Sequence, residues 1–304
     1  MCATVLCYNS TCPMPMTAPF SYEEAFAANR GLLTPDEQQR LRQTTVAIPG
    51  MGGVGGAHLL ALTRLGFERF AIADHDTFEL RNFNRQPGAT LQTIGQPKTT
   101  VMADMAKAIN PTASIRSFPE GIHVNNIDEF LTGCDVVVDG LDFFCMEARR
   151  LLFQRAHARR IPVVTCGPMG FSAALLVFMP DGPSFDQFMA IDDSMSAFEQ
   201  LARFAVGLAP AALHLPYLDP ASVNLKEHRG PSSSIATNLC AGIVAAEVMN
   251  VILKRRAPLG VPRYAQFDPY RLRYRVGTLW GGNHHPWQQL KLWYIRRAFG
   301  HGAP

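Results

Sequence analysis

Four glycines between an apolar run and a helical pattern are the first residues in this sequence whose spacing could do chemistry. Gly50, Gly52, Gly53 and Gly55 directly follow the short apolar run 46–48, and the helical pattern begins at once. Glycines between a strand and a helix let the backbone turn tightly and approach a phosphate, and the start of the helix supplies oriented N–H groups. The spacing therefore predicts a phosphate-binding turn.

An acidic residue follows this turn at a diagnostic distance. A second apolar run, 70–73, ends on Asp74, about 20 residues further along the chain. A carboxylate at the end of such a strand can accept hydrogen bonds from the hydroxyl groups of a ribose. The strand–helix–strand unit is therefore predicted to bind a nucleotide, although these residues do not say which one.

The next loop carries a carboxamide and two cations. Asn82, Arg85 and Lys98 stand beside the glycine turn, before the third expected strand. A dinucleotide redox enzyme has little use for two extra cations there. A triphosphate that is attacked at its α-phosphate does, because arginine and lysine can hold the departing pyrophosphate and offset charge on the phosphoryl oxygens. The loop favours a triphosphate over a redox cofactor.

Asp142 closes the set of candidate site residues. It comes just after Val136 to Val138, a β-branched run typical of a central parallel strand that is buried on both faces. Ligands of open α/β sheets bind at the carboxyl ends of such strands, and a carboxylate near phosphates is a natural Mg²⁺ ligand. Asp142 is therefore the expected metal ligand. The alternative, for each residue taken singly, is a solvated loop face or a loop cap.

The elements that position these residues follow an alternation of strands and helices. Strands are expected at 46–48, 70–73, 114–118, 136–138, 161–165 and 173–179, and helices at 101–109, 126–131, 145–160 and 235–254. Two helices are expected within 21–43, and an antiparallel pair at 264–267 and 271–276. This order predicts an α/β, Rossmann-like, doubly wound and mostly parallel sheet with N-terminal helices and a small C-terminal antiparallel addition.

Composition limits the class of protein. The chain has 304 residues, of which 47% are hydrophobic and 17% charged, with a net charge of +3, which suits a soluble globular protein and gives no reason to expect DNA or a membrane as a partner. No apolar run is expected to approach the 18 or so residues of a membrane span. Three prolines among the first twenty residues argue against a signal peptide, so a cytoplasmic location is expected. The seven cysteines contain no C-x-x-C pair, so no zinc is expected.

Five sequence motifs, taken together, resemble those of a known protein family. The runs GMGGVG, ADHD, NFNRQ, GQPK and VVVDGLD closely resemble, in order and spacing, the ThiF/MoeB group of adenylyltransferases in the ubiquitin-activating enzyme superfamily. The resemblance implies ATP with Mg²⁺, attack of a substrate carboxylate on the α-phosphate, and an acyl-adenylate with loss of pyrophosphate. It also implies a homodimer. The carboxylate would be the C-terminus of a ubiquitin-like carrier protein or peptide, or another small carboxylate.

The resemblance assigns roles by position. Gly50, Gly52, Gly53 and Gly55 match the phosphate loop, Asp74 the ribose ligand with Asp76 in the same nucleotide site, Asn82, Arg85 and Lys98 the triphosphate contacts, Gln86 a loop-ordering neighbour, and Asp142 the metal ligand. The family often adds an arginine from the other subunit, within an Asn-Arg pair. Asn29-Arg30 stands before the first strand, so Arg30 is expected to act in trans.

The chain is expected to divide into three parts. Residues 1–20, rich in Pro, Ser and Thr, are expected to form a flexible tail, 21–278 one ThiF-like adenylation domain, and 279–304 a C-terminal helical tail. Within the domain, the excursion at about 180–232 resembles the crossover loop under which the substrate's C-terminus threads.

The sequence departs from the family in three respects. It lacks the two C-x-x-C pairs of many relatives, Phe143 stands where a polar residue often follows the metal ligand, and no cysteine is clearly placed to form a thioester. Cys166 lies near an expected active-site edge, but nothing adjacent in sequence would lower its pKa.

Two other functions remain open at this point. One is an NAD-dependent oxidoreductase that uses the same strand–helix–strand unit, which leaves Arg85, Lys98 and Asp142 unexplained. The other is a non-catalytic scaffold of the same fold. Such members usually lose the metal ligand or the arginine, and this sequence keeps both.

Overall fold

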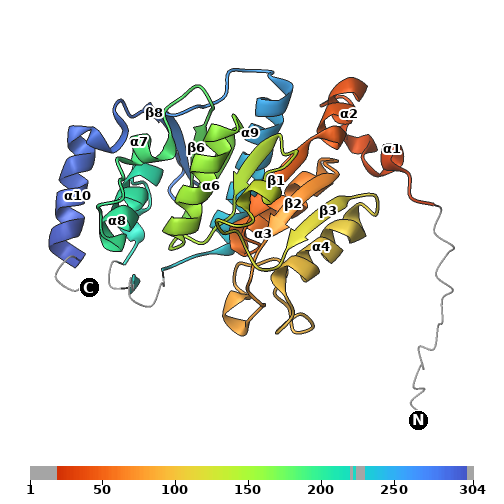
Figure 1. Ribbon diagram of the computed structural model, residues 1–304, viewed down its shortest axis with the longest axis horizontal. Coiled ribbons are helices and arrows are strands. Elements are labelled where there is room, and N and C mark those ends of the chain that lie inside the picture. Colours follow the sequence, from red (N-terminus) through yellow and green to blue (C-terminus); the bar gives the residue numbers. More distant parts are fainter. Residues whose placement is uncertain (1–18, 220–221, 224–229, 300–304) are drawn as a thin grey trace, which may run out of the picture.

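An eight-stranded sheet runs through the molecule in the order β3-β2-β1-β4-β5-β6-β7-β8 (Figure 1). The structure, a computed structural model, describes residues 19–219, 222–223 and 230–299. The strands are β1 (Thr45–Pro49), β2 (Arg69–Ala73), β3 (Ser114–Phe118), β4 (Val136–Asp139), β5 (Val163–Met169), β6 (Ser172–Phe178), β7 (Arg263–Asp268) and β8 (Arg273–Thr278). Neighbouring strands in the series β3-β2-β1-β4-β5 are parallel, and neighbouring strands in the series β5-β6-β7-β8 are antiparallel. The expected parallel sheet with an antiparallel addition is confirmed.

Helices cover both faces of the sheet. One face carries α3 (Gly53–Arg64), α4 (Lys98–Ile109) and α9 (Ser234–Leu253), and the other carries α5 (Ile127–Phe130), α6 (Met146–Ala158), α7 (Phe185–Met189) and α8 (Ala197–Leu208). Along the central strands of the sheet, side chains alternate between these two cores. In β4, for example, Val136 and Val138 join the first core and Val137 the second, all fully buried. The β-branched run thus forms the central strand that the sequence predicts.

Two short helices precede the sheet, as expected. In α1 (Tyr22–Ala25) Ser21 is the N-cap, and α2 (Pro35–Gln43) begins with a capping box between Thr34 and Glu37. The Tyr22 hydroxyl donates to the backbone carbonyl of Gly66 at 2.6 Å, beyond the C-terminal end of α3. The α1–α2 segment therefore lies near the C-terminal end of α3, which is the end opposite the glycine turn (Figure 1).

The long helix α9 crosses the first core. By length and composition α9 is apolar enough to cross a membrane, and 56% of its most apolar stretch is buried within the molecule. The prediction that no apolar run approaches the length of a membrane span is therefore wrong for 234–253. Cys240, Val244 and Val248 are fully buried in the core that contains α3. Burial between a sheet and a second helix explains why α9 is apolar along most of its length.

The excursion after β6 is more helical than the sequence suggests. One helical piece is expected near 194–206, and α8 fills that place, but α7 is a second helix with Ser184 and Gln187 in a capping box. Its five residues are too few to show a helical period in the sequence. Residues 220–221 and 224–229 of this excursion lie outside the described residues.

The remaining elements lie after β8 and in the connections. A C-terminal helix, α10 (Pro286–Phe299), packs against α8 through Leu292 and Val206. Short 3₁₀ turns are η1 (Ala27–Asn29), η2 (Leu80–Asn82), η3 (Leu215–Tyr217) and η5 (Gly282–His284). The flexible tail predicted at 1–20 falls largely on 1–18, outside the described residues.

A buried histidine in α3 makes stability depend on pH. His58 is fully buried and neither ring nitrogen has a hydrogen-bond partner among the described residues. Burial lowers the pKa of His58 from 6.5 to about 3. Below pH 6.5 the unfolded chain takes up a proton that the folded chain does not bind, so stability falls as the pH falls toward 3.

Replacing His58 by leucine should remove this dependence. Between pH 7 and pH 5 we expect His58 to account for a loss of about 2 kcal/mol in the free energy of unfolding, and His58→Leu to lack it. Urea unfolding at the two pH values measures the difference. His284→Leu, which removes an exposed imidazole, is the control. An equal loss in His58→Leu and in the wild-type protein would contradict the assignment.

Candidate nucleotide site

The glycine turn after β1 is packed against the loop after β4. Gly50 has a φ of +87°, and a Cβ atom there would lie 2.2 Å from the carbonyl oxygen of Gly140. A Cβ atom at Gly55 would lie 1.7 Å from the carbonyl oxygen of Gly50. Both positions therefore require glycine, because backbone occupies the space of a side chain. At Gly52, by contrast, the nearest atom to an added Cβ is 3.5 Å away, so contacts within the protein do not demand glycine there.

This turn lies where the order of the strands reverses. Strand β1 pairs with β2 on one side and with β4 on the other, so the carboxyl ends of these three strands share one edge. Ligands of open α/β sheets bind in the crevice at this switch point. Gly52 caps α3 and Gly53 begins it, which directs the N–H groups of the first helical turn to the crevice.

The two aspartates after β2 make different contacts. The Asp74 carboxylate accepts hydrogen bonds from the backbone N–H groups of Met51 (2.6 Å) and Asp76 (2.9 Å), which ties the glycine turn to the end of β2. Asp76 accepts from the Nζ of Lys98 at 2.8 Å. Partial burial acts to raise the pKa of Asp76, but the hydrogen bond and charge of Lys98 hold it below the usual value. The Lys98 side chain is largely buried, so this pair fixes its position.

The loop between β2 and α4 holds the other predicted residues. Asn82 is buried and its side-chain oxygen accepts from the N–H of Glu79 (2.9 Å), so it organises the loop. The Arg85 guanidinium donates to the carbonyl of Arg81 (3.1 Å) and to Asn84 (2.9 Å). Burial lowers the pKa of Arg85 and the charge of Asp142 partly offsets this, which places the two groups within electrostatic range.

Gln86 lies beneath the glycine turn. Its side chain is buried and provides the atoms nearest to an added Cβ at Gly52. Its Oε1 atom has no hydrogen-bond partner among the described residues. An orphaned polar atom at this point fits a site whose ligand is polar.

Asp142 has the features of a metal ligand for a nucleotide. It follows β4, is exposed, and accepts a hydrogen bond from the N–H of Phe144 at 3.0 Å. Magnesium bound to a nucleotide keeps several waters and takes one or two carboxylates besides the phosphates. One exposed carboxylate beside the glycine turn therefore fits this ion.

Two residues that the sequence reasoning misses also touch the site. The hydroxyl of Thr237, in α9, donates to the carbonyl of Arg85 at 3.4 Å, and its methyl group would lie 3.0 Å from a Cβ atom at Gly53. The Asn84 amide donates to the carbonyl of Ser232 at 3.0 Å, which attaches the end of the excursion to the same loop. Asn84 adjoins Arg85 in the sequence, whereas Thr237 is brought in by the fold alone.

Arg30 is not near these residues. Its guanidinium donates to the carbonyl of Glu23 (3.4 Å), and the neighbouring Asn29 donates to the carbonyl of Leu65 (3.3 Å) at the far end of α3. A helix of this length separates that end from the glycine turn by about 18 Å. Arg30 therefore does not contact the site of its own chain.

The described cysteines show no sign of an activated thiol. Cys166 is buried in β5 next to Cys240 of α9, and burial raises the pKa of Cys240 well above its usual value. Burial also raises the pKa of Cys145, after β4. A nucleophilic cysteine needs a lowered pKa.

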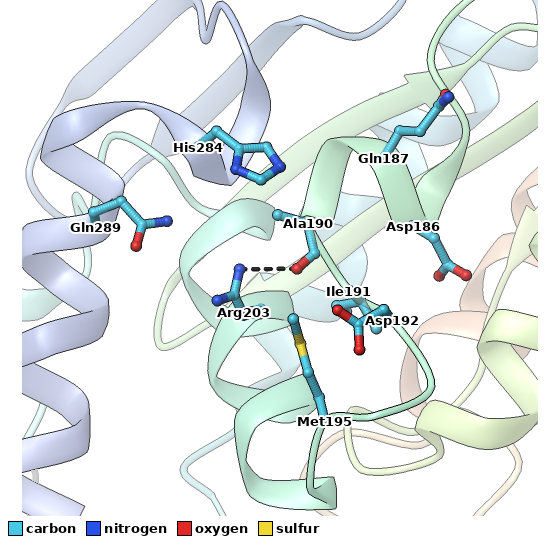
Figure 2. Close-up of a pocket in the computed structure, with 9 residues that line it drawn as sticks. All are labelled: Asp186, Gln187, Ala190, Ile191, Asp192, Met195, Arg203, His284 and Gln289. Atoms are coloured by element: carbon cyan, nitrogen blue, oxygen red, sulfur yellow. Dashed lines mark hydrogen bonds between the residues drawn. The ribbon is translucent and has the colours of Figure 1, made fainter.

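A separate hollow lies between α7, α8 and α10 (Figure 2). Its volume is about 530 Å³, and its lining residues are Asp186, Gln187, Ala190, Ile191, Asp192, Met195, Arg203, His284 and Gln289. Arg203 donates to the carbonyl of Ala190 at 2.8 Å and to Glu199 at 2.7 Å, so its charge is already engaged. Its lining includes no glycine, and the carboxylates of Asp186 and Asp192 do not favour a phosphate. The switch point is therefore the candidate site for the nucleotide.

The fold and the glycine turn together define a Rossmann-type nucleotide-binding α/β protein. The model of the ThiF family matches residues 26–285, and the chain belongs to that family. The resemblance seen in the sequence is thereby confirmed.

Individual relatives match over part of their length. The chain is 34% identical over 151 residues to the tRNA threonylcarbamoyladenosine dehydratase of Haemophilus influenzae, covering 49% of this chain and 57% of that protein. It is 29% identical over 145 residues to the sulfur carrier protein ThiS adenylyltransferase of Escherichia coli, covering 48% and 57%. The chain thus spans little more than half the length of these relatives. Escherichia coli MccB, solved with MccA-N7isoASN, has the same fold, with a TM-score of 0.64 at 17% identity over 87% of this chain and 73% of that one.

Proposed function

We propose that the protein is an ATP- and Mg²⁺-dependent adenylyltransferase that activates a substrate carboxylate as an acyl-adenylate. The observation that carries this proposal is that Arg85 packs against the start of α3 and lies within electrostatic range of Asp142, while Lys98 is paired with Asp76 after β2. Binding of a redox dinucleotide would not require this combination of cations and a carboxylate. Cleavage of a triphosphate between its α- and β-phosphates requires both the cations and the carboxylate.

The residues divide the reaction between them. The N–H groups at the start of α3 bind phosphate oxygens, and Asp74 accepts from the ribose. A substrate carboxylate oxygen attacks the α-phosphorus while the bond from that phosphorus to the bridging oxygen breaks, and pyrophosphate leaves with the electron pair. Arg85 offsets charge on the α-phosphoryl oxygens, and Lys98 holds the leaving pyrophosphate. Asp142 would hold Mg²⁺, which when bound neutralises charge on the phosphate oxygens.

The second substrate in this proposal is the C-terminus of a ubiquitin-like carrier protein or peptide. A relative that is named for the sulfur carrier ThiS favours a carrier. The attachment of Asn84 to Ser232 supports the excursion as the segment that covers the substrate's C-terminus, because it joins the end of that excursion to the triphosphate loop.

The test is ATP–pyrophosphate exchange together with intact mass. Small proteins and peptides that co-purify with the chain are added back one at a time with ATP, Mg²⁺ and labelled pyrophosphate. The proposal expects exchange with one of them and a mass gain of one adenylyl group. Binding of NADH instead of ATP would favour the oxidoreductase. ATP binding without pyrophosphate release, whatever the carboxylate, would favour the scaffold.

Mixing two inactive variants tests a homodimer in which Arg30 acts in trans. In a mixture of Arg30→Ala and Asp142→Ala chains, a mixed dimer contains one site with both defects and one intact site. We expect each variant alone to be inactive in exchange, and the mixture to recover a fraction of wild-type activity. Native mass spectrometry, with one variant uniformly labelled with ¹⁵N, detects the mixed dimers by their intermediate mass. No recovery in a mixture shown to contain mixed dimers would exclude the role in trans.

A further inference from the structure

The loop after β4, residues 140–145, is wrapped around one buried guanidinium. Arg149, in the first half of α6, is 2% exposed. Its Nη2 donates to the backbone carbonyls of Leu141 (2.8 Å) and Asp142 (3.1 Å), and its Nη1 donates to that of Phe143 (3.3 Å). Three consecutive carbonyls of the loop thus converge on a single side chain.

The guanidinium is itself fixed from the sheet. Its Nε donates to Asp139, the last residue of β4, at 3.0 Å, and Asp139 is 4% exposed. The same carboxylate accepts from the N–H of Leu141 (3.1 Å) and from the hydroxyl of Thr165 in β5 (2.9 Å). The ring of Phe204 covers the guanidinium at 4.3 Å. If the Asp139–Arg149 pair were broken, each charge would remain buried without a partner, which is unfavourable.

The position of Asp142 follows from these contacts. Its carbonyl is held by Arg149 inside the loop and its side chain is exposed, directly after Gly140 and Leu141, which contact the glycine turn. We infer that the Asp139–Arg149 pair is a positioning device that holds the Asp142 carboxylate in place for the metal. This inference rests on the proposed function. Neither member of the pair is placed to touch the nucleotide, since both are buried beneath the loop.

The chemistry of the pair calls for arginine. A planar guanidinium has five N–H donors in a fixed fork, and here four contacts are made in different directions. A lysine ammonium keeps the charge for Asp139 but cannot reach all three carbonyls from one position. Arg149→Lys therefore separates loop positioning from simple charge neutralisation.

Arg150 offers a matched control on the same helix. It is the next residue, is also paired with aspartates, and donates to Asp186 (2.9 Å and 3.0 Å) and Asp193 (2.8 Å), away from the loop. Arg150→Lys makes the same substitution without touching residues 140–145. A difference between the two variants therefore reports on the loop.

Three measurements test the inference. Hydrogen exchange followed by mass spectrometry reports on amides in 140–145, and electron paramagnetic resonance gives the affinity for Mn²⁺ in the presence of a non-hydrolysable ATP analogue. Isothermal titration gives the affinity for the analogue in the absence of metal. For Arg149→Lys we expect faster exchange in the loop and Mn²⁺ affinity reduced about 10- to 100-fold, with the affinity for the analogue in the absence of metal unchanged. Arg150→Lys should match the wild-type protein in all three.

The outcomes separate this inference from the proposed function. Wild-type Mn²⁺ affinity in Arg149→Lys overturns the inference and leaves the proposed function standing. Wild-type protein that binds no Mn²⁺ with the analogue overturns the proposed function and the inference with it. If Arg149→Lys does not fold, Asp139→Asn keeps the shape of the side chain and removes its charge, and the same pattern is expected of it.

Discussion

Replacing Arg85 or Asp142 by alanine is expected to reduce carboxylate-dependent ATP–pyrophosphate exchange by about 10²- to 10³-fold. Arg85 lies within electrostatic range of Asp142, and its partial burial strengthens its interaction with developing phosphoryl charge. Asp142 is the carboxylate that would hold the metal. Initial rates of exchange at saturating ATP and Mg²⁺ measure both losses.

A neighbouring arginine provides the control. Arg81 lies in the same loop, is mostly exposed, and forms an ion pair with Glu79 at 2.6 Å. Arg81→Ala should leave exchange close to the wild-type rate, because an exposed pair of this kind contributes little. Full exchange activity in Arg85→Ala and Asp142→Ala would refute the mechanism.

Gly55→Ala is expected to abolish ATP binding and to lower the free energy of unfolding by about 1–3 kcal/mol. Its methyl group would lie 1.7 Å from the carbonyl oxygen of Gly50, so the turn has to open. Opening the turn also separates it from Gly140 after β4, where the two loops are in contact. Isothermal titration with ATP and urea unfolding measure the two effects.

Gly242 is the matched control for this substitution. It lies in α9, is exposed, and has nothing within 4 Å of an added Cβ. Gly242→Ala should keep wild-type ATP affinity and raise stability by about 0.5–1 kcal/mol, since alanine favours the helix. ATP affinity in Gly55→Ala equal to that of Gly242→Ala would show that the turn does not bind the phosphates.

Most of the fold can be predicted from local patterns. A buried parallel strand such as β4 is recognised as a continuous β-branched run. The start of a helix such as α2 is recognised by an N-cap residue followed by a proline. The short helix α7 is missed because five residues carry no period. The apolar length of α9 is misjudged because a few polar residues, such as Thr237 and Asn238, interrupt the run.

The site is predictable only where its residues are close in sequence. The glycine turn, Asp74 and the loop from Asn82 to Lys98 are local, and the fold brings them to one edge. The pairing of Lys98 with Asp76 could not be foreseen, because it depends on the path of the loop between them. The contact of Thr237 with Arg85 joins residues 152 positions apart, and the packing of α9 alone creates it.

The helix α9 also separates the glycine turn from the N-terminal helices. Near its start, Thr237 touches the glycine turn, and just beyond its end Arg255 forms an ion pair with Glu37 of α2 at 2.6 Å. Twenty helical residues span about 30 Å. Because α9 is buried against the sheet, it works as a rigid spacer that keeps the segment bearing Arg30 away from the turn of its own chain. An arginine from 29–30 that completes this site has to be supplied by a second copy.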